Sequence, residues 1–290
     1  MKTYHTKMGM NIFLIICLLL TKPMVLFADD EQLRIGIFPR RSVAVTEKMF
    51  TPIASYLEEQ LGHKVLIDVP PDMPAFWSRL EQGKYDLVHL NQYHYVHAHA
   101  KLGWQAILKN EEFGKATIAG AIWVSEDSNI NSLSDLRGKL IVFGGGDHAM
   151  VASIMTRDLL MQAGIKEDSY IGMTTLHPLK SIISVYYKQA DAAGLGDMIG
   201  KIPAIKNKID IDKLRILAKS KSLAHLPWAV RSDVDVKIKE KIIRSLLLLN
   251  ESDRGRDILK TAGLTGIRQV SDSDYDEHRK IIKRVLGENY

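Results

Sequence analysis

The feature that most constrains the fold of this chain is a regular alternation of short apolar strands with helical segments. The apolar runs typical of buried strands are 33–38, 65–69 and 85–90. Between the first two, residues 46–61 carry apolar side chains at helical spacing, and Gly62 follows as a stop signal. Strands separated by helices in this order pair into a parallel sheet with helices on its faces. The sequence therefore predicts an α/β fold.

The alternation starts again near residue 139, which predicts a second unit of the same kind. A strand at 139–143 runs into the loop Gly144-Gly145-Gly146, and a long helix is expected at 147–163. The rest of this unit is a strand, a helix and a strand at 171–176, 178–188 and 190–193. Two α/β units in one chain predict two lobes, each with a mostly parallel sheet flanked by helices.

The last part of the chain predicts how the lobes are joined. After a short strand at 228–231 the pattern contains only helices, and one strand cannot build a third domain. The tail should therefore return to the first lobe, with crossings near 120–124 and 225–227 that form a two-strand hinge. The predicted lobes are 29–121 with 226–290, and 122–225.

The same topology predicts where a ligand binds. Ligands of open α/β sheets sit beyond the carboxyl ends of the strands. Two lobes that face each other would make a cleft from those ends, lined by the loops after Phe38, Leu90, Phe143 and Leu176.

Residues 1–28 have the layout of a secretory signal peptide. Lys2 and Lys7 precede an apolar run of about eleven residues, from Met10 to Leu20. This run is well short of the roughly 20 apolar residues that cross a bilayer, so a cleaved leader is expected rather than an anchor. Cleavage after Ala28 would release the protein into the periplasm.

The lone cysteine, Cys17, lies inside this leader. The exported chain is therefore expected to have no disulfide, thiolate metal site or cysteine nucleophile. Three of the 39 basic residues also belong to the leader, whereas none of the 34 acidic residues does. The exported chain is close to neutral, so its charge implies no nucleic-acid partner.

Five short motifs follow one another along the chain. They are Arg-Ile-Gly-Ile-Phe-Pro at 34–39, Gly-Lys-Tyr-Asp-Leu-Val at 83–88, Tyr-Val-His-Ala at 95–98, Ser-Leu-Ser-Asp-Leu-Arg-Gly-Lys at 132–139 and Ala-Asp-Ala-Ala at 190–193. In order and spacing they resemble the phosphate/phosphite/phosphonate-binding proteins of ABC importers, over residues 33–264. The resemblance implies a two-lobed periplasmic-binding-protein fold of type II and a membrane permease as partner.

One segment departs from the pattern of that family. Phosphonate binders carry Ser-Thr-Ser-Gly after the glycine-rich loop, where hydroxyl and backbone N–H groups hold the phosphoryl oxygens. Here His148-Ala149-Met150-Val151 stands in that place, preceded by Asp147, and no hydroxyl remains. The resemblance therefore implies the fold more firmly than a phosphonate ligand, and a zwitterion or a different oxyanion is an open alternative.

Arg40, Arg41 and Ser42 follow the first strand, in a loop with which the family reaches its ligand. A guanidinium offers a planar fork of donors suited to carboxylate, phosphate or sulfur oxyanions. One arginine that points inward would suffice, and the alternative is a solvated pair beside Pro39.

The glycine loop leads into a predicted helix, whose unpaired N–H groups and macrodipole favour an anion. Gly145, His148 and Ala149 are therefore candidate ligand contacts, with His148 as a side-chain donor. Asp147 has two interpretations, because it either caps the helix or points into the cleft and repels an anion.

Histidines and tyrosines gather at the third strand and the helix after it, namely His89, Tyr93, His94, Tyr95, His97 and His99. His94 and His97 share a helix face, but no acidic residue lies among them, so a metal site is not expected. Tyr93 and Tyr95 are the better ligand-binding candidates, because each combines flat apolar surface with a hydroxyl donor.

Two later residues complete the candidate site. His177 follows a strand at a position where the family often has a ligand-touching histidine, with capping or packing as the alternative. Asp197 follows another strand, where an acid of the family receives a ligand amine, but a helix N-cap is the simpler interpretation. Trp123 and Trp228 are expected to pack at the hinge.

Together these features predict a periplasmic receptor, expected to be a monomer without a cofactor, that passes a small anionic or zwitterionic ligand to an ABC permease. The alternative is a sensory binding protein for a membrane sensor kinase, because the family resemblance extends to the input modules of oxyanion sensors. Lobe closure would select the liganded form in either case. A secreted hydrolase with His148 or His177 as general base is disfavoured, since Gly-x-Ser-x-Gly, HExxH and P-loop motifs are absent and no catalytic residue is expected.

Overall fold

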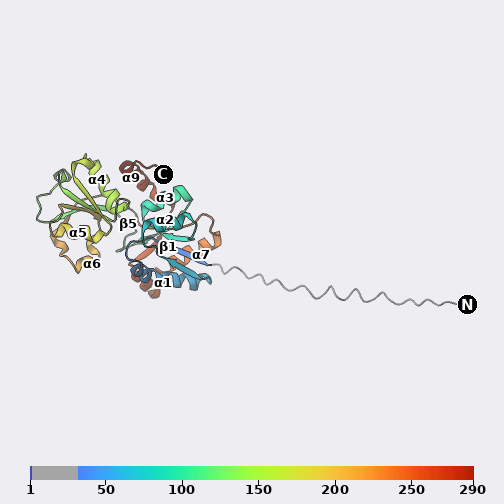
Figure 1. Cartoon of the computed structure of the whole chain (residues 1–290). Coiled ribbons are helices and arrows are strands. Elements are labelled where there is room, and N and C mark those ends of the chain that lie inside the picture. The colour runs from blue at the N-terminus through green and yellow to red at the C-terminus, as the bar shows by residue number, and fades with distance from the viewer. Residues whose placement is uncertain (2–31) are drawn as a thin grey trace. The chain divides into compact units, whose positions relative to one another are not determined.

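The computed structural model describes Met1 and residues 32–290, and it contains two large sheets that are each covered by helices (Figure 1). The predicted leader, Met1 apart, and its cleavage point after Ala28 lie outside the described residues. Within the part of the chain that the structure describes, no helix is both long and apolar enough to cross a membrane.

The first sheet has six strands in the order β13-β4-β12-β3-β1-β2. Their bounds are β1 Leu33–Ile37, β2 Val65–Asp68, β3 Leu87–His89, β4 Gln105–Glu111, β12 Pro227–Val230 and β13 Gly266–Gln269. β1 pairs in parallel with β2 and β3, whereas β12 runs antiparallel to β3 and β4. β13 also runs antiparallel to β4, so the end of the chain returns to the sheet with which it began.

Helices cover both faces of this sheet because its strand residues alternate between two cores. Leu87 belongs to the core beneath the first set of helices, and its neighbour Val88 belongs to the core beneath the second. The first set is α1 Val43–Leu61, α7 Val236–Leu248 and α8 Asp253–Thr261. The second set is α2 Met73–Glu81, α3 Gln92–Leu102 and α9 Asp276–Leu286.

The second sheet has five strands in the order β10-β6-β9-β7-β8. Their bounds are β6 Gly120–Ser125, β7 Leu140–Gly144, β8 Ile171–Thr175, β9 Ala192–Gly196 and β10 Leu214–Lys219. β7 pairs in parallel with β8 and β9, whereas β6 runs antiparallel to β9 and β10. The α-helices of this unit are α4 Met155–Gln162, α5 Pro178–Tyr186 and α6 Pro203–Lys206. Short 3₁₀ turns lie at Leu133–Leu136, Glu167–Ser169, Ile199–Lys201, Ile211–Lys213 and Asp272–Tyr275.

A separate ribbon connects the two sheets and confirms the two-strand hinge. β5 Thr117–Ile118 and β11 Leu223–Ala224 pair antiparallel, with Ile118 opposite Leu223. β5 lies between β4 and β6 in the chain, and β11 lies between β10 and β12, so both crossings pass through this ribbon. We propose that the lobes meet there, slightly before the predicted crossing at 120–124, because β6 already belongs to the second sheet.

Two segments differ from the prediction. Gly266–Gln269 was not expected to be a strand, but β4 offers it a hydrogen-bonding edge and it forms β13. The helix expected from residue 147 begins at Met150, with one π-helical turn over Met150–Ile154 before α4. The helix begins no earlier because Ala149 is extended, with φ −73° and ψ 103°, at the end of a loop in which Gly145 and Gly146 have φ angles of +83° and +81°.

Candidate functional site

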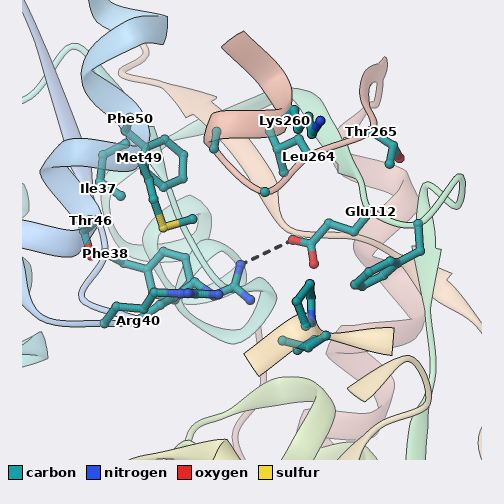
Figure 2. Close-up of a pocket in the computed structure, with 16 residues that line it drawn as sticks. Ile37, Phe38, Arg40, Thr46, Met49, Phe50, Glu112, Lys260, Leu264 and Thr265 are labelled. Carbon is teal, nitrogen blue, oxygen red and sulfur yellow. Dashed lines mark hydrogen bonds and ion pairs between the residues drawn. The ribbon is translucent and has the colours of Figure 1, made fainter. Parts of the chain in front are cut away.

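A pocket of about 260 Å³ lies among segments that are far apart in the sequence (Figure 2). Its walls come from β1 and the loop after it, the first turns of α1, the residues after β4, the start of α6 and the end of α8. The lining residues are Ile37, Phe38, Arg40, Arg41, Thr46, Met49, Phe50, Glu112, Phe113, Ile202, Pro203, Lys260, Ala262, Gly263, Leu264 and Thr265. Because α6 follows strands of the second sheet and the other segments flank strands of the first, the pocket lies between the two lobes.

Arg40 is positioned by the turn that ends β1. The Phe38 N–H donates to the His89 carbonyl at 3.1 Å, and the Arg40 N–H donates to the Phe38 carbonyl at 2.9 Å. The guanidinium of Arg40 lies over the Phe38 ring, with Cζ 5.9 Å from the ring centre. Its Nη1 is 3.3 Å from Oε1 of Glu112, and Figure 2 shows this ion pair as a dashed line. The charge of Arg40 is therefore already compensated by Glu112.

Glu112 is held as a carboxylate. Burial alone would raise its pKa, but Arg40, His225 and Asn110 together bring the pKa below its usual value. Asn110 Nδ2 donates to Oε1 at 3.3 Å, and His225 Nε2 lies 3.9 Å from Oε2. His225 Nδ1 accepts the Leu226 N–H at 2.8 Å, so the proton of a neutral ring lies on Nε2 and faces Glu112. Burial lowers the pKa of His225 more than Glu112 raises it.

Arg41 lines the pocket without a compensating partner. Among residues 32–290 no acidic side chain lies within ion-pair distance of its guanidinium, and no hydrogen bond to it is formed. Burial, and then the charge of Arg40, lower the pKa of Arg41 from its usual value, while Glu112 raises it. Arginine nevertheless stays protonated in proteins. An anion that enters the pocket therefore meets a positive charge that the described residues leave uncompensated.

Two buried polar side chains lie at or behind the pocket wall. The sequence singled out His89 among its histidines and tyrosines, but it did not assign Thr46 to a site. Thr46 lines the pocket, is 2% exposed, and its Oγ1 has no hydrogen-bond partner among the described residues. His89 lies behind the wall, with its ring 5.4 Å from that of Phe38 and 5.3 Å from that of Phe50. Burial, followed by the charge of Arg40, lowers the pKa of His89 well below its usual value. Thr46 was visible in the sequence only as the start of a predicted helix.

The glycine loop after β7 uses its polar groups internally. The N–H groups of Gly145 and Gly146 both donate to the Thr175 carbonyl, at 2.7 and 3.2 Å. The Ala149 N–H donates to the Gly146 carbonyl at 3.1 Å. These amides were expected to face an anion, but they already donate hydrogen bonds to carbonyl groups of β8 and of the loop itself.

Asp147 pairs with an arginine of its own lobe. Its Oδ1 is 3.0 Å from Nη2 of Arg157, and it does not line the pocket. The interpretation as a helix N-cap is wrong, because Ala149 is the residue that precedes the first helical turn. Arg157 on α4 draws the carboxylate away from the loop backbone.

His148 contacts the other lobe instead of the pocket. Its ring stacks on Tyr93 of α3, with the ring centres 4.6 Å apart and the planes 13° from parallel. Asn91 Nδ2 donates to the His148 carbonyl at 3.3 Å, while Asn91 Oδ1 accepts the His94 N–H and caps α3. The Tyr93 hydroxyl donates to Glu288 at 2.9 Å. We call the Tyr93–His148 stack, with Asn91, the cross-lobe contact.

Tyr95, His177 and Ser42 lie away from the pocket lining. Tyr95 is a core residue, because it is fully buried and its hydroxyl donates to Asp272 at 2.6 Å. His177 is exposed at the start of α5 and makes no capping hydrogen bond. Ser42 is exposed at the start of α1 and also makes none.

Asp197 makes its contacts beside the hinge and does not cap a helix. Its carboxylate accepts the Ala119 N–H at 3.3 Å and lies 3.6 Å from Lys219 Nζ, and the side chain is 7% exposed. Met198, not Asp197, precedes the next helical turn, so the N-cap interpretation is wrong. Ala119 joins β5 to β6, which places this contact beside the crossing.

The two tryptophans expected at the hinge each donate a hydrogen bond within their own lobe. Trp228 Nε1 donates to Asn110 Oδ1 at 3.0 Å, and Trp123 Nε1 donates to the Gly196 carbonyl at 3.3 Å. Within residues 32–290, no group of three or more metal-ligating side chains is arranged to hold a metal ion.

Two α/β lobes, a double crossing and a charged pocket between the lobes are the architecture of a periplasmic solute-binding protein. The family model described as ABC transporter, phosphonate, periplasmic substrate-binding protein matches residues 35–275. The chain therefore belongs to this family, and the resemblance drawn from the short motifs is confirmed. Members of this family are binding proteins of the periplasm.

Solved structures agree on the fold. PhnD1 from Prochlorococcus marinus (MIT 9301), in complex with methylphosphonate, matches with a TM-score of 0.76 at 16% identity, covering 89% of this chain and 100% of that one. XAC2383 from Xanthomonas citri, bound to ATP, matches with a TM-score of 0.74 at 18% identity, covering 88% and 98%. At such identities the likeness concerns the fold alone.

One curated relative has a different role. The tetrathionate sensor histidine kinase TtrS of Salmonella typhimurium (strain LT2) is 32% identical over 122 residues. The match covers 38% of this chain and 21% of the kinase.

Proposed function

We propose that this protein is the receptor of an ABC-type uptake system and that it captures a small anionic or zwitterionic ligand in the pocket between its lobes. Family membership supports the receptor role. The observation that carries the ligand class is Arg41, a guanidinium that lines the pocket without a counter-charge. Glu112, ionised beside it, would tolerate a ligand that also carries an ammonium group.

A thermal-shift screen of the protein purified from the periplasm tests this proposal. The compounds are phosphonates, phosphite, phosphate, sulfur oxyanions, carboxylates and amines. A ligand present at 100 times its dissociation constant adds about 2.7 kcal/mol to the stability of the folded state, which is readily detected. Stabilisation by amines alone, with none by anions, would contradict the proposal.

Substitution of the pocket arginines gives the matched test. The double variant Arg40→Ala with Arg41→Ala should abolish the shift produced by the anion that the screen identifies. Arg244→Ala is the control, because Arg244 is an exposed arginine on α7 that does not line the pocket. An unchanged shift in the double variant would remove both arginines from the site.

A second role, signal delivery to a membrane sensor kinase, is favoured by the match to the tetrathionate sensor kinase. The two roles differ in what fails when the gene is deleted. Loss of the receptor should stop accumulation of labelled ligand in the uptake role. In the sensory role it should leave uptake intact and abolish ligand-dependent transcription.

A further inference from the structure

We propose that two copies of this chain associate through the free edge of strand β8, so that the second sheet continues from one copy into the other. The partner is a second copy of the same chain, paired antiparallel about Met173. This contact goes beyond the proposed function and is independent of the ligand, because the described lining of the pocket includes no residue of β8.

β8 differs from the other edge strands in carrying no charged residue. Within residues 32–290, the two large sheets end at β2, β13, β8 and β10. β2 contains Asp68, β13 contains Arg268, and β10 contains Arg215 and Lys219 together with a shift in register. Charges and irregular register on an edge strand oppose its pairing with another chain. The sequence of β8, Ile-Gly-Met-Thr-Thr, has neither feature.

The backbone of β8 offers hydrogen bonds at its free edge. The Ile171 N–H donates to the Lys139 carbonyl at 2.9 Å, so residue 171 and every second residue after it face β7. The N–H and carbonyl groups of Gly172 and Thr174 therefore point to the free edge. In an antiparallel pair centred on Met173, Gly172 lies opposite Thr174 of the second copy, and these two residues exchange both hydrogen bonds.

The side chains of β8 are exposed although two of them are large and apolar. Ile171 is 60% exposed and Met173 is 55% exposed, and the two share one face of the strand. Leu176, directly after the strand, is 79% exposed. Pairing about Met173 places this residue opposite its own copy and Ile171 opposite Thr175. The contact therefore buries apolar surface from both chains.

Exposed charges at the two ends of β8 favour the antiparallel orientation. Glu167 and Asp168 precede the strand, with Lys166 beside them, whereas His177 and Lys180 follow it. Within residues 32–290, Asp168 and Lys180 form no ion pair. Antiparallel pairing brings the acidic end of each copy to the basic end of the other, whereas parallel pairing would bring like charges together. The charges and the free hydrogen-bonding groups therefore agree on the same arrangement.

Sedimentation velocity of the protein purified from the periplasm, between about 1 and 200 µM, is the first test. The average mass should rise with concentration from one chain to two. Met173→Lys places two ammonium groups against each other at the centre of the pair and should raise the dissociation constant of the dimer about 30-fold or more. Ile216→Lys is the matched control and should leave the dimer unchanged, because Ile216 is exposed on β10 at the opposite edge of the same sheet.

Two further variants test the backbone pairing and the register. Thr174→Pro removes an N–H that points to the free edge, so it should weaken the dimer about tenfold while the bonds to β7 keep the strand folded. Met173→Cys, in a Cys17→Ala background, should form a disulfide between copies on air oxidation, because residues opposite each other in a non-hydrogen-bonded pair have Cα atoms about 4.5 Å apart. Ile171→Cys should form none, since it lies opposite Thr175 of the second copy.

The outcomes decide between this contact and its alternatives. A mass of one chain at every concentration would overturn the proposal and agree with the monomer that the sequence predicted. A dimer that Met173→Lys leaves intact would place the interface elsewhere and would also overturn it. If Met173→Lys unfolds the protein, the cysteine variants decide, because no disulfide through Met173→Cys, or an equal yield through Ile171→Cys, contradicts the pairing. A monomer whose Met173→Lys variant loses ligand uptake would assign the edge to the membrane permease instead of a second copy.

Discussion

The sequence of the loop after β1 and that of the loop after β7 both suggested an anion site. In the structure the two loops differ in whether their polar groups already have partners within the protein. In the first loop, Arg41 remains without a partner beside a pocket. In the second, the amides of Gly145 and Gly146 donate to Thr175, and Asp147 pairs with Arg157. Residue types therefore indicate a ligand site only where the hydrogen-bond donors and charges are not already satisfied by partners within the protein.

The largest expected effect is on ligand affinity in the first loop. Arg41→Ala should weaken an anionic ligand about 100-fold, near 2.7 kcal/mol, because it removes the uncompensated charge. The free energy of unfolding without ligand should change by less than about 0.5 kcal/mol, since the side chain has no partner to lose. Calorimetry and urea unfolding measure the two effects, and a large loss of stability would contradict the description of Arg41 as free.

Behind the same loop, the buried histidines predict a dependence of stability on pH. The pKa values of His89 and His225 are lowered in the folded protein by burial, so the unfolded chain binds more protons below pH about 6.5. The folded protein therefore has its full stability above that pH. As the pH falls toward the folded-state pKa, the free energy of unfolding decreases, because the unfolded chain takes up protons that the buried rings do not. Each histidine should lower the free energy of unfolding by up to about 1.4 kcal/mol per pH unit in that range.

Urea unfolding between pH 7.5 and 5.5 checks this dependence. His89→Leu should reduce the slope, because one of the groups that titrates on unfolding is removed. His177→Leu, which changes an exposed side chain near the second loop, is the matched control and should leave the slope unchanged. Equal slopes in wild type and His89→Leu would remove His89 as a source of the effect.

In the second loop the expected effect is on folding rather than on ligand. Gly145→Ala should destabilise the protein by about 1–2 kcal/mol, because φ is +83° and a Cβ would lie 2.9 Å from that of Ala149. Gly164→Ala separates the two causes, since its φ is +71° but no atom lies within 4 Å of an added Cβ. Chemical denaturation measures both. Ligand affinity should stay within about twofold of the wild-type value. A larger loss of affinity in Gly145→Ala would show that this loop contributes to ligand binding.

The smallest effect is expected at Asp147. Asp147→Asn removes an exposed carboxylate from Arg157, which keeps Glu167 as a second partner, so it should cost at most about 1 kcal/mol of stability. Affinity for an anion should not change, because Asp147 does not line the pocket. A clear gain in anion affinity would show that the carboxylate repels the ligand, which is the alternative that the sequence left open.

The fold was largely predictable because its signals are local. Helix α1 follows from apolar spacing within one segment, and the strands of both sheets follow from short apolar runs. β13 was missed because Gly266–Gln269 is short and becomes a strand only through the edge that β4 offers. The order of the strands was enough to predict two lobes and a double crossing.

The candidate site was predictable only in part. Arg40 and Arg41 were found because they follow a strand directly, but Glu112, Thr46 and Leu264 come together with them only through tertiary packing. Tyr95 was assigned to the ligand by its residue type, whereas Asp272, distant in sequence, engages its hydroxyl in the core. Which polar groups remain unpaired depends on such partners, and a single sequence does not reveal them.

The crossing ribbon has a consequence for how long a ligand stays bound. β5 and β11 are the paired strands through which the chain passes between the sheets, so the lobes can separate by rotation without breaking either large sheet. Such a rotation would break the cross-lobe contact, where His148 stacks on Tyr93 outside the pocket lining. Residues that never touch the ligand would therefore lengthen its residence time and raise its affinity, whereas the choice among ligands would be left to the residues that line the pocket.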